Sequence, residues 1–414
     1  MRQNTFILWT IWLLSSLFYA YQYIIRVLPN ILMPTILEKY QIDANIFGQF
    51  SGIYYIGYAL AHIPLGILLD RTGPKKVIPA CILITVLGLA PLTFTNIWIY
   101  PVIGRLFIGI GSSAAILGVF KIIRMSFEEK YFSRILGFSV MIGLLGAIYG
   151  GLPVNFLITH YGVNHTITLF IILGIALAVT LYFLIPELSE DSHIKEHTTV
   201  FKEIKTVLTN KMVFSVCILG ALMLGPLEGF ADVWGTEFFK IRYQFSQNTS
   251  AFLPSLIFFG MCIGAPILSY FANKTQAYYR LMILSALVMG FSFIYLFKGI
   301  SSLIIMEIIL FIIGFFCAYQ ILVIYKATTY ISERFIGLTT AVANMIIMLF
   351  GYVFHTIIGS LVNYAWNGKI INNVPQYTAN NLIFGLSIIP IGLLIAACGF
   401  IFISLYELKR KKHV

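Results

Sequence analysis

Long apolar runs separated by short polar segments make up almost the entire chain. A helix needs about 20 apolar residues to cross the roughly 30 Å hydrocarbon core of a membrane. Windows of this length occur twelve times, which predicts an all-α membrane protein with twelve transmembrane helices. The predicted spans are residues 6–34, 46–69, 76–95, 97–121, 133–158, 165–185, 211–238, 250–272, 279–297, 301–326, 335–363 and 381–406.

The longest polar interruption runs from Pro186 to Asn210 and divides the twelve helices into two sets of six. Within it, Val200, Ile204 and Val207 recur at helical spacing, which predicts an amphipathic helix on the inner membrane surface. The predicted domains are an N-terminal six-helix bundle over residues 1–190, a cytoplasmic linker over 191–210 and a C-terminal six-helix bundle over 211–414.

Two short motifs occur in both halves of the chain. The pattern R-x-x-G at residues 134–137 recurs 200 residues later, at 334–337. The sequence G-I-L-L-D-R at residues 66–71 has a degraded partner, S-Y-F-A-N-K, at 269–274. Matching motifs at nearly equal offsets predict two pseudo-symmetric bundles that arose by duplication.

A burst of charge and glycine follows the second predicted helix. The residues from Gly66 to Lys76 read G-x-L-x-D-R-x-G-x-K-K, which closely resembles the signature loop between the second and third helices of the major facilitator superfamily. The resemblance implies the twelve-helix fold of that family, a transport function and a gate on the cytoplasmic side. The gate residues are expected to be Gly66, Asp70, Arg71, Gly73, Lys75 and Lys76, with Arg134 in the next loop on that side.

Two contacts are expected at this gate. The carboxylate of Asp70 is suited to accept hydrogen bonds from the free amides of the eleventh predicted helix, which begins near Phe335, because a helix N-terminus favours an anion. Arg71 is expected to pair with Glu128 or Glu129 in the next cytoplasmic loop.

Composition excludes an ordinary soluble fold. Apolar residues make up 59% of the 414 residues and charged residues 10%, against about 45–50% and about 25% in soluble domains. The first apolar run is too long for a cleaved signal peptide, so it is interpreted as the first membrane helix.

The net charge of +11 is explained by topology, so nucleic acid is not an expected partner. Most of the 27 Lys and Arg residues fall in predicted cytoplasmic loops. This bias places both termini in the cytoplasm, and the sequence is compatible with a bacterial inner membrane. The bases of the predicted outer loops are Lys39, Lys240, Arg242, Lys298 and Lys369.

Neither a cofactor nor a metal site is expected, and an enzyme is not expected either. The five cysteines are dispersed through apolar spans and suggest no disulfide or metal framework. The sequence contains no ATPase loop of the G-x-x-x-x-G-K-[ST] type. Energy for transport must therefore come from an ion or solute gradient, unless transport is facilitated.

Ionisable side chains inside the apolar spans are the main candidates for substrate or coupling contacts, because each costs about 2.5–3.5 kcal/mol at a helix centre. With an offset near 203 residues, Arg26 corresponds to the position between Glu228 and Asp232, and Arg105 to the position beside Glu307. Bases in one half are thus expected to face acids in the other. Arg105 could equally organise backbone carbonyls, and Glu307 could reach the outer surface.

Aromatic and amide side chains near these charges are candidates for the lining of a substrate cavity. The alternative for each one is ordinary packing or hydrogen bonding between helices. The candidates are Tyr23, Tyr58, Trp234 and Gln320.

These residues predict a secondary active transporter for a small polar solute. Arg26 is suited to hold a substrate carboxylate. An ammonium group or a coupling proton is expected at Glu228, Asp232 or Glu307. A zwitterionic or carboxylate-bearing nutrient fits, such as an amino acid, a short peptide or an organic anion. The expected partners are this small molecule, a proton and the lipid bilayer, with the protein as a monomer.

Resemblances within the family leave alternatives open. The run from Tyr21 to Arg26 also resembles the first helix of organophosphate antiporters, but those proteins add a second base on the seventh helix, where this chain has acids. A multidrug or metabolite exporter is disfavoured because Ala147 replaces the proline of the drug-antiporter pattern. A non-transporting sensor or receptor on the same fold is the alternative of another class.

Overall fold

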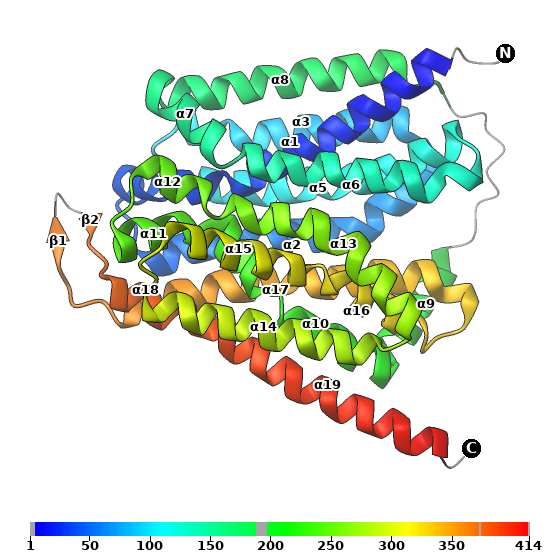
Figure 1. Ribbon diagram of the computed structural model, residues 1–414. Coiled ribbons are helices and arrows are strands. Elements are labelled where there is room, and N and C mark those ends of the chain that lie inside the picture. The colour runs from blue at the N-terminus through cyan, green and yellow to red at the C-terminus, as the bar shows by residue number, and fades with distance from the viewer. Residues whose placement is uncertain (1–4, 188–196, 372–373, 413–414) are drawn as a thin grey trace. The chain divides into compact units, whose positions relative to one another are not determined.

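The computed structural model describes residues 5–187, 197–371 and 374–412, and most of them lie in helices (Figure 1). The chain divides into two compact units. Unit 1 contains Met1–Ile42 and Phe50–Lys195, and unit 2 contains Asp43–Gln49 and Glu196–Val414. The predicted linker starts at residue 191, within a stretch that lies outside the described residues. The domain boundaries predicted from the sequence stay a prediction.

Unit 1 consists of α1, most of α2, and the elements from α3 to α8. Helix α3 packs on α5 and α8, and α1 packs on α5 and α6. The 36-residue helix α1 continues through Pro29 and Pro34. The elements are α1 (Thr5–Tyr40), α2 (Ala44–Thr72), α3 (Pro74–Leu89), α4 (Pro91–Phe94), α5 (Ile99–Ser126), the 3-10 helix η1 (Glu129–Tyr131), α6 (Phe132–Tyr149), α7 (Leu152–Tyr161) and α8 (Val163–Leu184).

Unit 2 contains the remaining helices and a two-stranded antiparallel hairpin of β1 and β2. Its helices are α9 (His197–Thr209), α10 (Lys211–Leu222), the π-helix η2 (Gly225–Trp234), α11 (Gly235–Tyr243), α12 (Gln247–Phe252), α13 (Ser255–Thr275), α14 (Tyr278–Lys298), α15 (Leu303–Cys317), α16 (Tyr319–Thr328), the 3-10 helix η3 (Glu333–Phe335), α17 (Ile336–Tyr364), α18 (Ala379–Leu386) and α19 (Ile388–Lys412). The strands are β1 (Ile370–Ile371) and β2 (Val374–Pro375).

The predicted twelve-helix, all-α membrane fold is confirmed. Within the described residues, eleven helical spans are long and apolar enough to cross a membrane, and the bent pair α6 and α7 makes a twelfth. The helix axis bends by 41° between them, at the break formed by Gly150 and Gly151. Several helices run a few residues past their predicted ends.

The two units repeat one packing scheme, as the internal sequence repeat predicts. The pair α3 and α8 in unit 1 corresponds to α14 and α19 in unit 2, and α1 with α5 corresponds to α10 with α16. Glycine allows close helix crossings at matching places. A Cβ on Gly57 would collide with the carbonyl oxygen of Leu106, and one on Gly260, 203 residues later, with that of Phe311.

The amphipathic helix predicted before the seventh span is present as α9. Val207 is fully buried on its apolar face, and α9 packs on α10 and α17. The guanidinium of Arg334 donates a hydrogen bond to the carboxylate of Glu203 at 2.8 Å. This ion pair joins α9 to the short helix η3 that precedes α17.

Candidate functional site

A proline inside α1 determines what Arg105 does. Pro29 has no amide hydrogen, so the carbonyl oxygen of Ile25, four residues earlier, lacks its usual helical donor. Arg105 of α5 donates from Nη1 to this oxygen at 3.0 Å and from Nη2 to the carbonyl oxygen of Arg26 at 2.6 Å. Its side chain is 3% exposed. Arg105 therefore supports the backbone segment that carries Arg26.

Aromatic rings surround the guanidinium of Arg26 within unit 1. Its Cζ atom lies 5.0 Å from the ring centroid of Tyr23, on the preceding turn of α1, and 5.3 Å from that of Tyr55 on α2. Arg26 is 3% exposed, Tyr23 8% and Tyr55 1%. Cation–π attraction at such desolvated sites contributes about 2 kcal/mol. The two rings therefore stabilise the buried positive charge of Arg26.

The tyrosines of α2 extend this cluster along unit 1. The hydroxyl of Tyr54 donates to Oε1 of Gln22 at 2.9 Å, and the ring of Tyr54 lies 5.0 Å from Cζ of Arg105. The ring of Tyr58 stacks on His62 with centroids 5.3 Å apart. Gly109 of α5 allows α2 to approach closely at Tyr54, because a Cβ at position 109 would collide with the carbonyl oxygen of Tyr54.

Glu228 and Asp232 lie on an unusual segment of unit 2. Helix α10 ends at Leu222, and a π-helix then runs from Gly225 to Trp234. π-Helical turns are rare in proteins, and those that do occur often lie at functional sites. All ten residues of η2 are buried, and the two acids are each 1% exposed. Two buried carboxyl groups one turn apart form a natural place for cation or proton binding.

Trp234 and Gln320 each bury a hydrogen-bond donor. The Nε1 atom of Trp234 and the Nε2 atom of Gln320 have no hydrogen-bond partner among the described residues. The indole of Trp234 packs edge-on against Phe47, with centroids 5.7 Å apart. Gln320 follows the break between α15 and α16, where the hydroxyl of Tyr319 donates to the carbonyl oxygen of Gly220 at 2.9 Å.

Glu307 differs from the other predicted acids. It lies in the second turn of α15 and is half-buried, and it has no ion pair or hydrogen bond to any residue that the structure describes. Its neighbours Ile304 and Ile308 are 68% and 53% exposed. Glu307 thus occupies a more open position than Glu228 and Asp232.

The gate loop makes a contact that the sequence did not indicate. The Nζ atom of Lys121 on α5 lies 2.8 Å from Oδ1 of Asp70. The expected pairing of Arg71 is wrong: Arg71 has no ion pair within the described parts of the chain, and Glu128 pairs at 2.6 Å with Lys130, two residues away in its own loop. Glu128 has a partner two residues away in Lys130, whereas a pair with Arg71 would have to join two loops.

The other gate residues have distinct surroundings. Gly73 has φ of +80°, a backbone conformation that favours glycine, and it starts α3 just before Pro74. Lys75 lies 3.3 Å from the carboxylate of Glu187. Gly66 has room for a Cβ within unit 1. The exposed residues of this set are Asp70, Arg71, Lys76 and Arg134.

The first turns of α2 pack with unit 2, a relationship that the sequence did not reveal. Cβ atoms on Gly48 and Gly359 would collide with the carbonyl oxygens of His355 and Ala44, respectively. The backbone amide of Ala44 also donates to the hydroxyl of Tyr377 at 2.8 Å. Gly48 was the available signal, since a glycine in an apolar helix indicates close packing.

Polar side chains flank this glycine contact between α2 and α17. Asn363 donates to the carboxylate of Asp43 at 3.1 Å, and Ser360 donates to Oδ1 of Asn45 at 2.8 Å. Together they tie the segment Asp43–Gln49 to α17 through both small residues and hydrogen bonds.

Two bacterial transporters resemble the chain in sequence. The uncharacterised transporter YybO of Bacillus subtilis is 25% identical over 69% of this chain and 72% of its own length. The uncharacterised transporter BU466 of Buchnera aphidicola is 26% identical over 46% of this chain. The chain spans half the length of that second relative.

Solved structures share the fold. A bacterial homologue of the human lysosomal transporter Spinster matches with a TM-score of 0.77 at 17% identity, over 97% of this chain and 98% of its own. The nucleoside transporter NupG matches with a TM-score of 0.74 at 14% identity, over 94% and 98%. The family model described as Major Facilitator Superfamily matches residues 12–355. The chain therefore belongs to the major facilitator superfamily and is a multi-pass membrane transporter.

Proposed function

We propose that this transporter moves a carboxylate-bearing or zwitterionic nutrient by alternating access, as a secondary active system. The observation that carries the proposal is the buried guanidinium of Arg26, held between the rings of Tyr23 and Tyr55. A guanidinium presents paired donors that match the two oxygens of a carboxylate. The support from Arg105 keeps the Arg26 backbone in one position, which favours a defined substrate pose.

Unit 2 supplies groups of complementary chemistry. The buried acids Glu228 and Asp232 suit an ammonium group or a coupling proton. A buried donor without a partner costs roughly 1–3 kcal/mol. The donors of Trp234 and Gln320 would recover this cost if a polar solute supplied an acceptor. The two buried acids of unit 2 favour a solute with an ammonium group over a phosphate ester, because like charges repel.

A ligand screen tests the proposal. Purified protein is heated with amino acids, short peptides, organic acids, sugar phosphates and nucleosides, and the denaturation midpoint is recorded. Nucleosides are included because the similar NupG transports them. A bound ligand raises the midpoint progressively as its concentration increases. Stabilisation by phosphate esters or nucleosides alone would refute the carboxylate assignment.

Transport is then measured in proteoliposomes with the ligand that binds. Uptake driven by an imposed pH gradient is expected for proton-coupled import. Accumulation in the opposite direction would indicate an exporter, and binding without any flux would indicate a sensor.

The proposal includes a bacterial inner membrane, both termini in the cytoplasm and a monomer. The excess of Lys and Arg in alternate loops supports the orientation. Labelling of single cysteines at Gln41 and Arg280 with an impermeant maleimide in whole cells tests it, because only residue 41 should react. Light scattering of the detergent-solubilised protein tests the monomer.

A further inference from the structure

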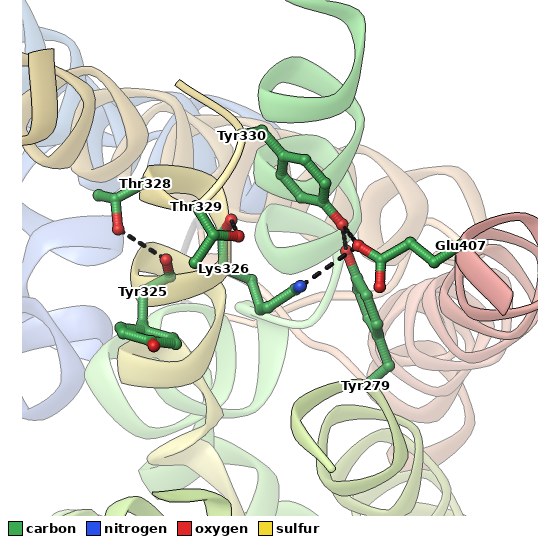
Figure 2. Close-up of polar contacts among 7 residues, drawn as sticks. All are labelled: Tyr279, Tyr325, Lys326, Thr328, Thr329, Tyr330 and Glu407. Carbon is green, nitrogen blue, oxygen red and sulfur yellow. Dashed lines mark hydrogen bonds and ion pairs between the residues drawn. The ribbon is translucent and has the colours of Figure 1, made fainter. Parts of the chain in front are cut away.

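Four side chains form a closed polar cluster where three membrane spans of unit 2 end. Tyr330 donates to the carboxylate of Glu407 and also bonds to Tyr279, and the Nζ atom of Lys326 lies 3.2 Å from the same carboxylate (Figure 2). Nζ of Lys326 is 4.9 Å and 5.0 Å from the ring centroids of Tyr279 and Tyr330. Burial and the Glu407 carboxylate raise the pKa of Tyr330, so its hydroxyl stays protonated as a donor.

A recess of about 390 Å³ lies beside this cluster. It is rich in hydrogen-bond donors: hydroxyls from several tyrosines and threonines, one ammonium and one guanidinium. Its single carboxylate, Glu407, is already engaged by Lys326 and Tyr330. The lining residues are Thr275, Gln276, Ala277, Tyr278, Tyr279, Arg280, Tyr325, Lys326, Thr329, Ser404 and Glu407.

Arg280 gives the recess its charge. Lys326 is neutralised by Glu407, whereas Arg280 is exposed and has no carboxylate partner in the described part of the chain. The stacked rings of Tyr278 and Tyr325, with centroids 4.6 Å apart, form one wall next to it. The recess therefore combines one uncompensated positive charge with many neutral donors.

We infer that this recess binds an anionic phosphate group. Phosphate oxygens accept several hydrogen bonds at once and favour arginine, and the recess offers both features. Candidate membrane spans begin at Tyr278 and end at Thr328 and Glu407, so the recess lies at the level of lipid headgroups. Basic pockets between transmembrane helices at this level suit anionic headgroups. A soluble phosphate ester shares this chemistry and is the other source.

Titration of delipidated, detergent-solubilised protein tests the inference. The probes are phosphatidylglycerol, phosphatidylcholine with the same acyl chains, and glycerol 3-phosphate, and the readout is the half-saturating concentration of the shift in denaturation midpoint. Arg280→Gln is compared with Lys274→Gln. Lys274 carries the same charge six residues away and does not line the recess.

If phosphatidylglycerol binds, and Arg280→Gln weakens it roughly tenfold while Lys274→Gln does not, the recess is a headgroup site. The same pattern with glycerol 3-phosphate alone supports the phosphate chemistry with a soluble source. Equal loss in both variants, equal binding of phosphatidylcholine, or no binding of any probe would overturn the inference. Arg280 is exposed, so its replacement should leave the fold intact.

Discussion

Arg105 donates a hydrogen bond to the carbonyl oxygen of Ile25, 3.0 Å away, where Pro29 has removed the helix's own donor. We predict that Arg105→Gln lowers stability by about 1–3 kcal/mol, because it leaves a buried carbonyl unsatisfied. In a Pro29→Ala background the amide of residue 29 can bond to Ile25. The loss caused by Arg105→Gln should then be smaller, as measured by thermal denaturation of the four proteins. Equal losses in both backgrounds would contradict this role.

Binding of the solute should require the guanidinium group of Arg26 and not only its positive charge. Arg26→Lys keeps the charge but loses the paired donors, so we expect roughly tenfold weaker binding of the solute found in the screen. Tyr55→Phe keeps the cation–π contact and should bind almost normally, whereas Tyr55→Leu should not. Titration calorimetry measures these affinities. Wild-type affinity in Arg26→Lys would refute the proposal that Arg26 binds a substrate carboxylate.

Glu228 and Asp232 should control coupling. We predict that Glu228→Gln or Asp232→Asn abolishes uptake driven by a pH gradient, while exchange of labelled for unlabelled solute continues in at least one of the two variants. A neutral amide can no longer carry the coupling proton. The matched control is Glu237→Gln. Glu237 lies just beyond the π-helix, and its carboxylate lies 3.9 Å from Nζ of Lys240. If this variant impairs coupling as strongly, the role is not specific to η2.

The glycine contact between α2 and α17 should tolerate no side chain. Gly359→Val is expected to push the segment Asp43–Gln49 off α17, since a Cβ there meets backbone. The readout is labelling of Ala44→Cys, a fully buried position, by an impermeant maleimide. Gly337→Val is the control on the same helix, because a Cβ there meets nothing within 4 Å among the described residues. Equal labelling in both variants would exclude the contact.

Replacement of Asp70 should change the transport rate more than the free energy of unfolding. Its side chain is 76% exposed, so the pair with Lys121 contributes only about 0–1 kcal/mol. We predict that Asp70→Asn slows transport in proteoliposomes while binding and the denaturation midpoint stay near wild type. The charge swap Asp70→Lys with Lys121→Asp tests the pair itself: recovery of the rate assigns the effect to this pair, and no recovery assigns it to another partner of Asp70.

Most of the fold was predictable because hydrocarbon allows few solutions. An apolar run of about 20 residues must form a helix there, so the spans followed from hydropathy alone. The duplication was also visible, through motifs at matching offsets. The irregular helix could not be predicted. All ten residues of the segment Gly225–Trp234 are buried, so no alternation of buried and exposed positions distinguishes a π-helix from an α-helix there.

The candidate site was predictable in residue types more than in contacts. Burial of Arg26, Glu228 and Asp232 followed from their position inside apolar spans. The partners of Arg105 did not, since a backbone carbonyl leaves no mark in the sequence except Pro29 four residues on. The pairing proposed for Arg71 failed because Glu128 pairs with Lys130 in its own loop, and the sequence does not rank a local partner against a distant one.

Helix α2 is one continuous rod of 29 residues, about 44 Å long, whose first turns belong to unit 2 and whose remainder belongs to unit 1. The close approach of Gly48 to Gly359 therefore determines where the first turns of α2 lie within unit 2. In a conformational equilibrium that breaks this contact, each 1.4 kcal/mol removed from it would shift the population ratio about tenfold, with no change in intrinsic affinity for solute.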